Sequence, residues 1–484
     1  MNITELKPEL IWKYFDEITQ IPRPSKNEGK IREYLVNFGK INGFETQTDA
    51  IGNVVIRKNA TSGFENLKSV VLQSHMDMVC EKNNDVAFDF DKDSIQTWID
   101  GEWVKAKGTT LGGDDGIGIA ASLAILMDDS IQHGPLECLF TVDEETGLTG
   151  AFELENSMVK SRILLNLDSE DEGELFIGCA GGRDTLAFLP YKMTKASEDY
   201  SALRIEIVGL TGGHSGDDIN KGFANANILL VRILWQAQRE FGLQLSHIDG
   251  GNLRNAIARE AVADVLIPNN HLADFKTFVK IMSDNFKAEY HVTEPNLEVR
   301  LFADKNFHEV IEAETVVKML NALYACPHGV IAMSQDIANF VETSTNLASI
   351  KLKDSKIVMT TSQRSSVESA LDSVCNKVNA VFTMIGAEIL HTDGYPGWTP
   401  NTKSEVMEIT KTAYIDLFKK EPKVLAIHAG LECGLIGKKF PGMDMISFGP
   451  TIKGAHSPDE RMKIDTVKMF WDLIIEVLKR IPKA

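Results

Sequence analysis

The sequence predicts an α/β fold in which an α/β domain is interrupted by an inserted α+β domain. Up to residue 185, short β-rich runs alternate with helical segments, which is typical of a largely parallel sheet covered on both faces. From 186 to 394, half-exposed strands combine with long amphipathic helices, which indicates an antiparallel sheet with helices on one face. The first pattern then returns. We therefore expect a discontinuous domain, 1–185 plus 395–484, and an insertion at 186–394.

Hydrophobic spacing gives the elements of the discontinuous domain. Ser25 and Glu28 have the spacing of a capping box, and apolar residues then recur at helical intervals, so we expect a helix over 24–42. The Ala-rich apolar stretch 117–127 predicts a buried helix. Before residue 185, the β-rich runs are 54–56, 70–72, 136–142 and 163–167. After residue 395, the sequence predicts helices at 403–418 and from 465, and strands at 424–427 and 445–448.

The insertion follows a different pattern. Residues 203–208 alternate apolar and polar side chains, as a half-exposed antiparallel strand does. Residues 221–241 have the periodicity of a long amphipathic helix. Further helices are expected near 269–284, 309–324 and 367–385, and a strand pair near 348–361.

Composition limits the classes of function. The chain has 484 residues, 43% of them hydrophobic, which allows two or three domains with cores of their own. A net charge of −19 argues against nucleic acids and anionic membranes as partners. The sequence shows no signal peptide and no membrane-spanning run, and its six scattered cysteines are typical of reduced thiols. We therefore expect a cytoplasmic protein.

Five polar clusters carry residues of the types that bind divalent metals, and three of them directly follow predicted strands. His75 and Asp77 follow one strand, the acidic triplet 143–145 follows another, and Asp168 follows a third. Open α/β sheets bind ligands at the carboxyl ends of their strands. We therefore expect these side chains to lie at one edge of the sheet.

The other two clusters are the turn Gly113-Asp114-Asp115-Gly116 and the segment around His456. Two histidines with a surplus of carboxylates form the ligand set of a pair of borderline divalent ions, most often zinc. Two adjacent ions make a hydrolytic site. Each cluster alone is explained as well by an exposed turn or a helix N-cap. Their conjunction favours a metal site, in which either Asp114 or Asp115 could bridge the ions.

Three further residues suit catalytic work around such a site. In the acidic triplet, one glutamate can bind metal while its neighbour acts as general base. Asp77 can accept the second ring N–H of His75 and fix its tautomer. His214 stands in Gly-Gly-His-Ser-Gly, where an exposed imidazole can donate to a developing oxyanion. A flexible turn is the simpler explanation of that segment.

These motifs resemble the M20 family of zinc peptidases, and within it the Xaa-His dipeptidases, over essentially the whole chain. The segments that carry the resemblance are SHMDMV, TTLGGDDGIGIA, TVDEETGLTG, LLNLDSEDEGE, GLTGGHSGDDI, NAIARE, HAGLECG and GAHSPDE. The resemblance implies a dizinc metallopeptidase, with cobalt or manganese as substitute ions, that hydrolyses small peptides. It also implies a homodimer in which the inserted domain serves as lid and dimer interface.

The resemblance further implies a metal-binding role for five residues. His75 and Asp168 would hold one zinc ion, Glu145 and His456 would hold the other, and Asp114 would bridge the two.

Catalytic and substrate-binding roles are implied in the same way. Glu144 would be the general base, Asp77 would orient His75, and His214 would reach the oxyanion from its own or the neighbouring subunit. The implied substrate-binding residues are Asn255, Arg364 and Gly430.

Two alternative functions use the same residues. The first is an M20 amidohydrolase that removes the acyl group from N-acyl amino acids. The second is a non-enzymatic metal-binding scaffold, which is disfavoured because every ligand position and the base position keep a suitable residue.

Overall fold

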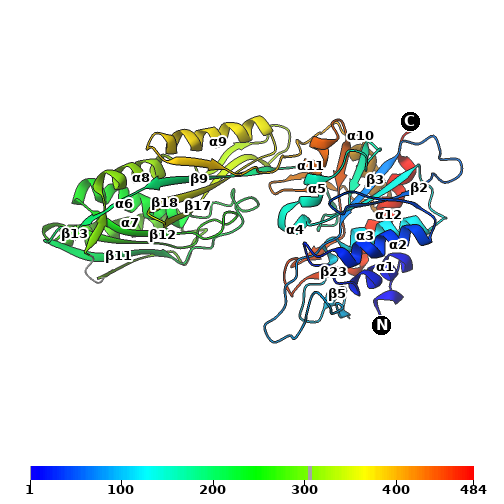
Figure 1. The fold of residues 1–484 in the computed structure, drawn as a ribbon, viewed down its shortest axis with the longest axis horizontal. Coiled ribbons are helices and arrows are strands. Elements are labelled where there is room, and N and C mark those ends of the chain that lie inside the picture. The colour runs from blue at the N-terminus through cyan, green and yellow to red at the C-terminus, as the bar shows by residue number, and fades with distance from the viewer. Residues whose placement is uncertain (1, 304–307) are drawn as a thin grey trace. The chain divides into compact units, whose positions relative to one another are not determined.

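The computed structural model describes residues 2–303 and 308–484, and the chain divides into two compact units (Figure 1). Unit 1 comprises Met1–Gly178, Trp398–Ala426 and Leu431–Ala484, and unit 2 comprises Cys179–Gly397 and Ile427–Gly430. The first boundary lies before residue 185 because β9 (Gly181–Pro190) pairs with β18 (Lys356–Ser365) in the sheet of unit 2. The sequence pattern gave no sign that the short segment Ile427–Gly430 belongs to unit 2.

Eight strands among the described residues of unit 1 form one sheet, in the order β1-β2-β6-β3-β7-β21-β8-β20. Its centre is parallel, because β3 (Val70–His75) lies parallel to both β6 (Leu136–Thr141) and β7 (Ile163–Asn166). β21 (Asp444–Ser447) continues this parallel set beside β7. These central strands are buried, as their apolar sequences predict.

The flanks of this sheet correct the expectation of a largely parallel arrangement. β1 (Glu45–Thr48) and β2 (Val54–Lys58) form an antiparallel pair, and β2 is also antiparallel to β6. The connection from β1 to β2 is too short for the crossover that parallel pairing needs, so these two strands pair antiparallel. β8 (Glu174–Cys179) is antiparallel to β21, and β20 (Lys423–Ile427) forms the far edge.

The helices of unit 1 hold the central strands in place. α3 (Gly113–Met127) is the expected buried helix and packs on β3 and on α1 (Glu9–Thr19). α10 (Glu405–Phe418) packs on β21 and on the C-terminal helix α12 (Ile464–Arg480). The shorter helices are η1 (Ile3–Glu5), α4 (Glu144–Gly147), α5 (Thr149–Glu153) and α11 (Glu432–Lys439).

The helix expected over 24–42 is α2, which spans only Gly29–Ile41. The predicted capping box is wrong, because Glu28 rather than Ser25 stands at the N-cap and both side chains have contacts elsewhere in the fold. The Ser25 hydroxyl donates to Asp77 at 2.8 Å, and the Glu28 carboxylate accepts the backbone N–H of Asp143 at 3.1 Å. Tertiary contacts have overridden a local sequence rule.

A second, four-stranded sheet of unit 1 has the order β22-β23-β5-β4, and sequence analysis did not predict it. β22 and β23 form an antiparallel pair, and His456 lies in the loop between them. The strands are β4 (Thr97–Asp100), β5 (Trp103–Ala106), β22 (Ile452–Lys453) and β23 (Arg461–Lys463).

Unit 2 contains a sheet with nine strands among its described residues, and the pairs are antiparallel as expected. The order is β14-β11-β13-β12-β17-β18-β9-β19, with β16 beside β17. The strands of this sheet not yet given are β11 (Tyr200–Val208), β12 (Gln244–Gly250), β13 (Ala261–Pro268), β14 (Glu298–Ala303), β16 (Gly329–Met333), β17 (Val341–Lys353) and β19 (Glu388–His391). β10 (Met193–Lys195) and β15 (Glu309–Ile311) pair with each other in a separate two-stranded sheet.

One apolar core joins this sheet to four helices. The helices are α6 (Ala226–Phe241), α7 (Leu272–Glu289), α8 (Ala313–Ala325) and α9 (Glu368–Thr383), preceded at α7 by the turn η2 (Asn269–His271). The first of them starts later than the expected residue 221, because the Asn225 side chain accepts the N–H groups of Asn227 and Ile228 and so caps the helix.

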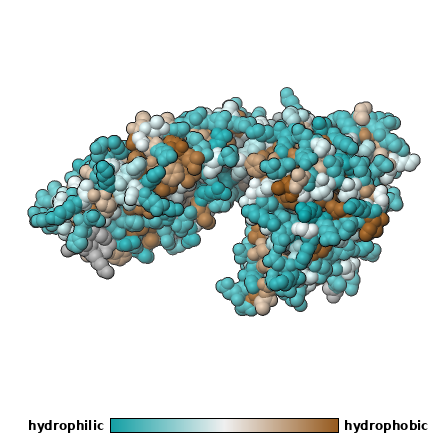
Figure 2. All heavy atoms as spheres, viewed as in Figure 1, coloured by the Kyte–Doolittle hydropathy of each residue, from teal (hydrophilic) through white to brown (hydrophobic). Residues whose placement is uncertain are grey.

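The surface carries mostly polar side chains in the view of Figure 2, in keeping with the strong net charge. Over residues 2–303 and 308–484, no helix combines the length and the apolar character that a bilayer crossing requires.

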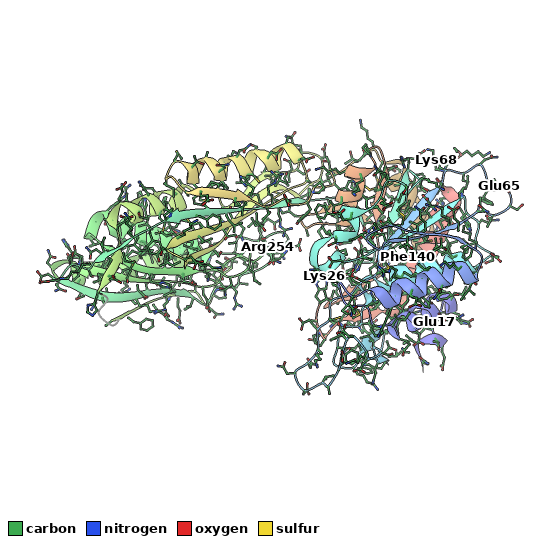
Figure 3. All side chains as sticks on the ribbon, viewed as in Figure 1. Glu17, Lys26, Glu65, Lys68, Phe140 and Arg254 are labelled. Carbon is green, nitrogen blue, oxygen red and sulfur yellow. The ribbon has the colours of Figure 1, made fainter. Side chains whose placement is uncertain are left out.

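Phe140 in the central strand β6 offers a test of the core of unit 1 (Figure 3). Its side chain is fully buried, so Phe140→Ala should lower the free energy of unfolding of this unit by ~3–5 kcal/mol. Urea denaturation followed by circular dichroism measures the change. The control is Phe152→Ala on α5, whose side chain is 37% exposed and should cost much less. Equal destabilisation by the two changes would contradict the described packing.

Candidate functional site

The carboxyl edge of the parallel strands brings the expected ligands of unit 1 together. His75 is the last residue of β3, the acidic triplet follows β6, and Asp168 follows β7. Since β3 lies between β6 and β7, these three positions are neighbours across the sheet. His75 Nε2 lies 3.5 Å from Asp168 Oδ1.

The Asp114 carboxylate lies between the two histidines. Its Oδ1 is 3.0 Å from His75 Nε2, and its Oδ2 is 3.1 Å from His456 Nε2. His456 Nε2 is also 3.0 Å from Glu145 Oε2. Each oxygen of one carboxylate thus faces a different imidazole, which is the arrangement that a carboxylate bridging two ions needs.

Asp115 points into the protein. Its carboxylate accepts the backbone N–H of His75 at 3.3 Å and that of Gly118 at 3.1 Å, in the first turn of α3. Burial raises the pKa of Asp115 well above its usual range. Of the two aspartates that the sequence left open, the geometry favours Asp114 as the bridge.

The donor set fits divalent metal ions. His75, Asp114 and Glu145 present ligand atoms that all lie within 4.8 Å of one another. Glu145 Oε1 is buried and has no hydrogen-bond partner in the described part of the chain. Carboxylates gathered this closely repel one another unless cations neutralise them, and imidazole with carboxylate is the set that borderline ions prefer.

The same carboxylates raise the pKa of both histidines. Hydrogen bonds with Asp114 and Glu145 raise the pKa of His456 to about 11. Burial lowers the pKa of His75, but Asp168 and Asp114 outweigh burial and bring it well above its usual value. Without metal, these carboxylates therefore favour the protonated form of both imidazoles.

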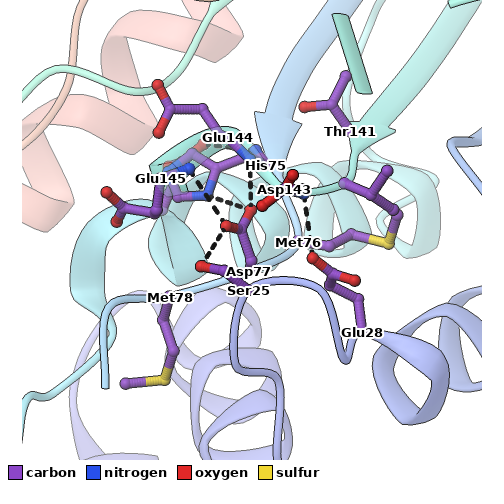
Figure 4. Close-up of polar contacts among 12 residues, drawn as sticks. Ser25, Glu28, His75, Met76, Asp77, Met78, Thr141, Asp143, Glu144 and Glu145 are labelled. Carbon is purple, nitrogen blue, oxygen red and sulfur yellow. Dashed lines mark hydrogen bonds and ion pairs between the residues drawn. The ribbon is translucent and has the colours of Figure 1, made fainter. Parts of the chain in front are cut away.

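Asp77 connects His75 to the backbone of both glutamates (Figure 4). Its Oδ1 lies 3.4 Å from His75 Nδ1 and accepts the N–H of Glu144 at 3.0 Å. Its Oδ2 accepts the N–H of Glu145 at 3.2 Å and the Ser25 hydroxyl. Burial acts to raise the pKa of Asp77, but the contact with His75 outweighs burial and lowers this pKa to about 2. Asp77 therefore remains an anion that can orient the imidazole.

Glu144 and Glu145 leave the turn after β6 in different directions (Figure 4). Asp143, just before them, has a φ of 49°, in the left-handed region, and Glu28 holds its N–H. The Glu145 carboxylate contacts His456. Burial, together with nearby carboxylates, raises the pKa of Glu144 well above its usual range.

A buried polar layer next to the ligands escaped sequence analysis. Glu432 Oε2 accepts Gln73 Nε2 at 2.6 Å and Thr141 Oγ1 at 2.7 Å, and Gln73 Oε1 accepts Asn166 Nδ2 at 2.6 Å. Gln73 and Asn166 each stand two residues before an expected ligand, so they share its face of the sheet. Burial raises the pKa of Glu432 to about 8. Its place in HAGLECG was the only sequence signal.

Unit 2 gathers three of the expected substrate-binding and catalytic residues around Tyr395. Arg364 Nη1 donates to the Tyr395 hydroxyl at 3.1 Å, and Arg364 Nη2 lies 3.5 Å from His214 Nε2. A Cβ on Gly430 would come within 2.6 Å of the Tyr395 ring, so glycine permits this close approach. Tyr395 was not among the residues expected from the sequence.

Asn255 is placed beside this group through its backbone. Its carbonyl accepts the N–H of Ser215 at 2.8 Å, and His214 pairs with Ala256 in an isolated β-bridge. The Asn255 side chain is exposed. The loops that carry NAIARE and GGHSG are therefore neighbours within unit 2.

Comparison with known proteins decides the family. The model of peptidase family M20/M25/M40 matches residues 71–480. The chain belongs to this family. The resemblance noted in the sequence is thus confirmed.

Two similar proteins match this M20 member over nearly their whole length. The cytosol non-specific dipeptidase of Escherichia coli (strain K12) is 43% identical over 481 residues, which are 99% of each chain. The crystal structure of aminoacylhistidine dipeptidase from Vibrio alginolyticus has a TM-score of 0.94 and 42% identity, and the match covers 100% of this chain and 99% of that one. The predicted α/β class is therefore confirmed.

A more distant structure shares only the fold. Aminopeptidase PepT from Bacillus cereus gives a TM-score of 0.58 at 15% identity, over 98% of this chain and 99% of that one.

Metal affinity of this M20 member should rise with pH. Because the pKa of His456 is raised to about 11, a metal ion must displace a proton at neutral pH. Between pH 6 and 9, affinity should increase up to ~10-fold per pH unit for each displaced proton. Chelator competition measures the affinity, and calorimetry in buffers of different ionisation enthalpy counts the protons.

His456→Gln should weaken binding and release fewer protons. The control is His291→Gln, which removes an exposed histidine of unit 2. Affinity that does not change with pH, with no proton released, would contradict the assigned ligand set.

Proposed function

We propose that this chain is a dizinc dipeptidase that acts in the cytosol as a homodimer, on Xaa-His dipeptides or a broader set. One observation carries the proposal: Asp114 lies between His75 and His456, with Glu145 and Asp168 beside them. The names of the two full-length relatives, a cytosol non-specific dipeptidase and an aminoacylhistidine dipeptidase, support the substrate class and the compartment.

The five ligands divide into two sets that share one member. His75 and Asp168 would hold one ion, Glu145 and His456 the other, and Asp114 both. When bound there, a zinc pair supplies polarisation of the scissile carbonyl and lowers the pKa of water toward neutrality.

Glu144 carries the proton in this mechanism. Burial raises its pKa, and divalent charge bound nearby would oppose that rise. Its carboxylate would take a proton from the attacking water and deliver it to the leaving amine. Asp77 accepts the Glu144 N–H and so holds the start of this side chain in place.

The group around Tyr395 is assigned to the rest of the substrate. Arg364 brings a fixed positive charge, which suits the carboxylate of a dipeptide, and Asn255 and the backbone at Gly430 would add hydrogen bonds. His214 would donate to the oxyanion, from its own or the neighbouring subunit. A lid role for unit 2 would limit substrate length. These assignments remain predictions.

Glu144→Gln tests the general base. The amide keeps the shape of the side chain but cannot accept the proton, so kcat for a dipeptide should fall ~10²–10⁴-fold. Metal content, measured by mass spectrometry, should stay at the wild-type level. The control is Glu153→Gln, a matched change at an exposed position on α5. Near-normal turnover by Glu144→Gln would overturn the assignment.

Metal removal tests the reaction class. Chelated protein should lose hydrolysis of every substrate, and zinc, cobalt and manganese restored in turn should return it to different degrees. A panel of dipeptides, with Xaa-His members, and of N-acyl amino acids then separates the candidates. Preference for the N-acyl amino acids would favour the deacylase. Metal binding with no hydrolysis of any amide would favour the scaffold.

A further inference from the structure

The loop that leads to Asp114 is held by two buried charged side chains that are not among the assigned ligands. Gly112 in this loop has a φ of 69°, in the left-handed region, and α3 begins at the next residue. Glu460 and Arg23 approach it from different parts of the chain, and each is only 2% exposed. Charged groups are rarely buried without specific partners.

Glu460 occupies the N–H groups of the loop. Its Oε2 accepts Leu111 N at 2.7 Å and Gly112 N at 3.0 Å, and its Oε1 accepts Gly113 N at 2.8 Å. The N–H of Asp114 also points to Oε1, at 3.4 Å. Successive backbone N–H groups around one anion form a nest, so the carboxylate fixes the backbone just before the bridging aspartate.

Glu460 also belongs to the segment that carries His456. Both stand in the connection from β22 to β23, four residues apart in the sequence. The Glu460 side chain therefore joins the loop that carries His456 to the loop that carries Asp114, the proposed bridging ligand. The two ligands that these loops carry lie 3.1 Å apart, from His456 Nε2 to Asp114 Oδ2.

Arg23 donates hydrogen bonds to backbone carbonyl groups of the same loop and of the segment after His75. Its Nη2 donates to Gly112 O at 2.5 Å, and its Nη1 donates to Met76 O at 3.0 Å and to Asp77 O at 2.6 Å. The planar guanidinium thus joins the loop before Asp114 to the segment that follows His75. A Cβ on Gly112 would lie 2.7 Å from Arg23 Nη2, so the contact also requires glycine at that position.

We propose that Glu460 and Arg23 are positioning residues that assemble three ligand segments before metal binds. The inference rests on the proposed function, because the segments are those of the assigned ligands His75, Asp114 and His456. A pre-formed site avoids the cost of ordering these loops when the ions bind. Residues that orient metal ligands in this indirect way commonly change metal affinity or activity by 10–100-fold when they are replaced.

Glu460→Gln tests the proposal, because the new amide has nearly the same size but turns N–H donors toward the backbone N–H groups of the loop. We expect ~10–100-fold weaker zinc binding by chelator competition, and a lower kcat with the KM for a dipeptide within about twofold of wild type. The control is Asp459→Asn, which removes the same charge at an exposed neighbouring position. Zinc affinity is measured on the folded, metal-free protein, whose melting temperature is recorded separately.

A merely structural role predicts a different result. If Glu460→Gln lowers the melting temperature but leaves zinc affinity and kcat equal to those of Asp459→Asn, the proposal is overturned. If Glu460→Gln does not fold, Arg23→Lys decides. Arg23→Lys keeps the positive charge but loses the planar guanidinium group with its several N–H donors. If the zinc affinity of this variant equals that of the wild type, the proposal is overturned.

The failure of this inference is distinct from a failure of the proposed function. A wild-type protein that neither binds zinc nor hydrolyses dipeptides would refute the dizinc dipeptidase itself. A wild-type protein that does both, with Glu460→Gln behaving as the Asp459→Asn control, would refute only the positioning role.

Discussion

The contact of one carboxylate, that of Asp114, with two histidines is the constraint around which unit 1 is organised. His75 ends a central strand, Asp114 opens a buried helix, and His456 lies in a loop between short strands of a second sheet. Their approach to about 3 Å requires three separate elements to be placed with an accuracy that no single element provides. The parallel strands fix the first position, and backbone contacts from Glu460 and Arg23 fix the others.

Electrostatics explains why this arrangement suits cations. Asp77, Asp114, Glu145 and Asp168 lie within reach of only two imidazoles, so the metal-free site compensates for its negative charge by holding protons on those imidazoles. Hydrogen bonds with Asp114 and Glu145 raise the pKa of His456 in this way. Divalent ions would replace the protons and neutralise the same carboxylates, so metal binding should be coupled to proton release.

The sequence predicted which candidate ligands meet at one edge of the sheet, because apolar runs followed by polar residues locate the carboxyl ends of parallel strands. It left Asp114 and Asp115 open, since the choice depends on how one turn directs two adjacent side chains. It assigned Ser25 and Glu28 to a capping box, because that rule uses only local spacing. The Ser25 hydroxyl instead donates to Asp77, and the Glu28 carboxylate accepts the N–H groups of Lys26 and Asp143. Glu460 stands in GAHSPDE, but its role could not be predicted, because its partners are backbone N–H groups, which carry no sequence signature.

The two neighbouring glutamates show how the backbone assigns chemistry to residues of the same type. Asp77 accepts the N–H of both, so their main-chain positions are set by the carboxylate that also orients His75. The left-handed Asp143 before them turns the chain sharply, so the two side chains leave in different directions. Glu145 meets His456, and Glu144 does not share that contact. In the proposed mechanism, ligand and base are therefore distinguished by position on one turn, because their carboxyl groups are chemically identical.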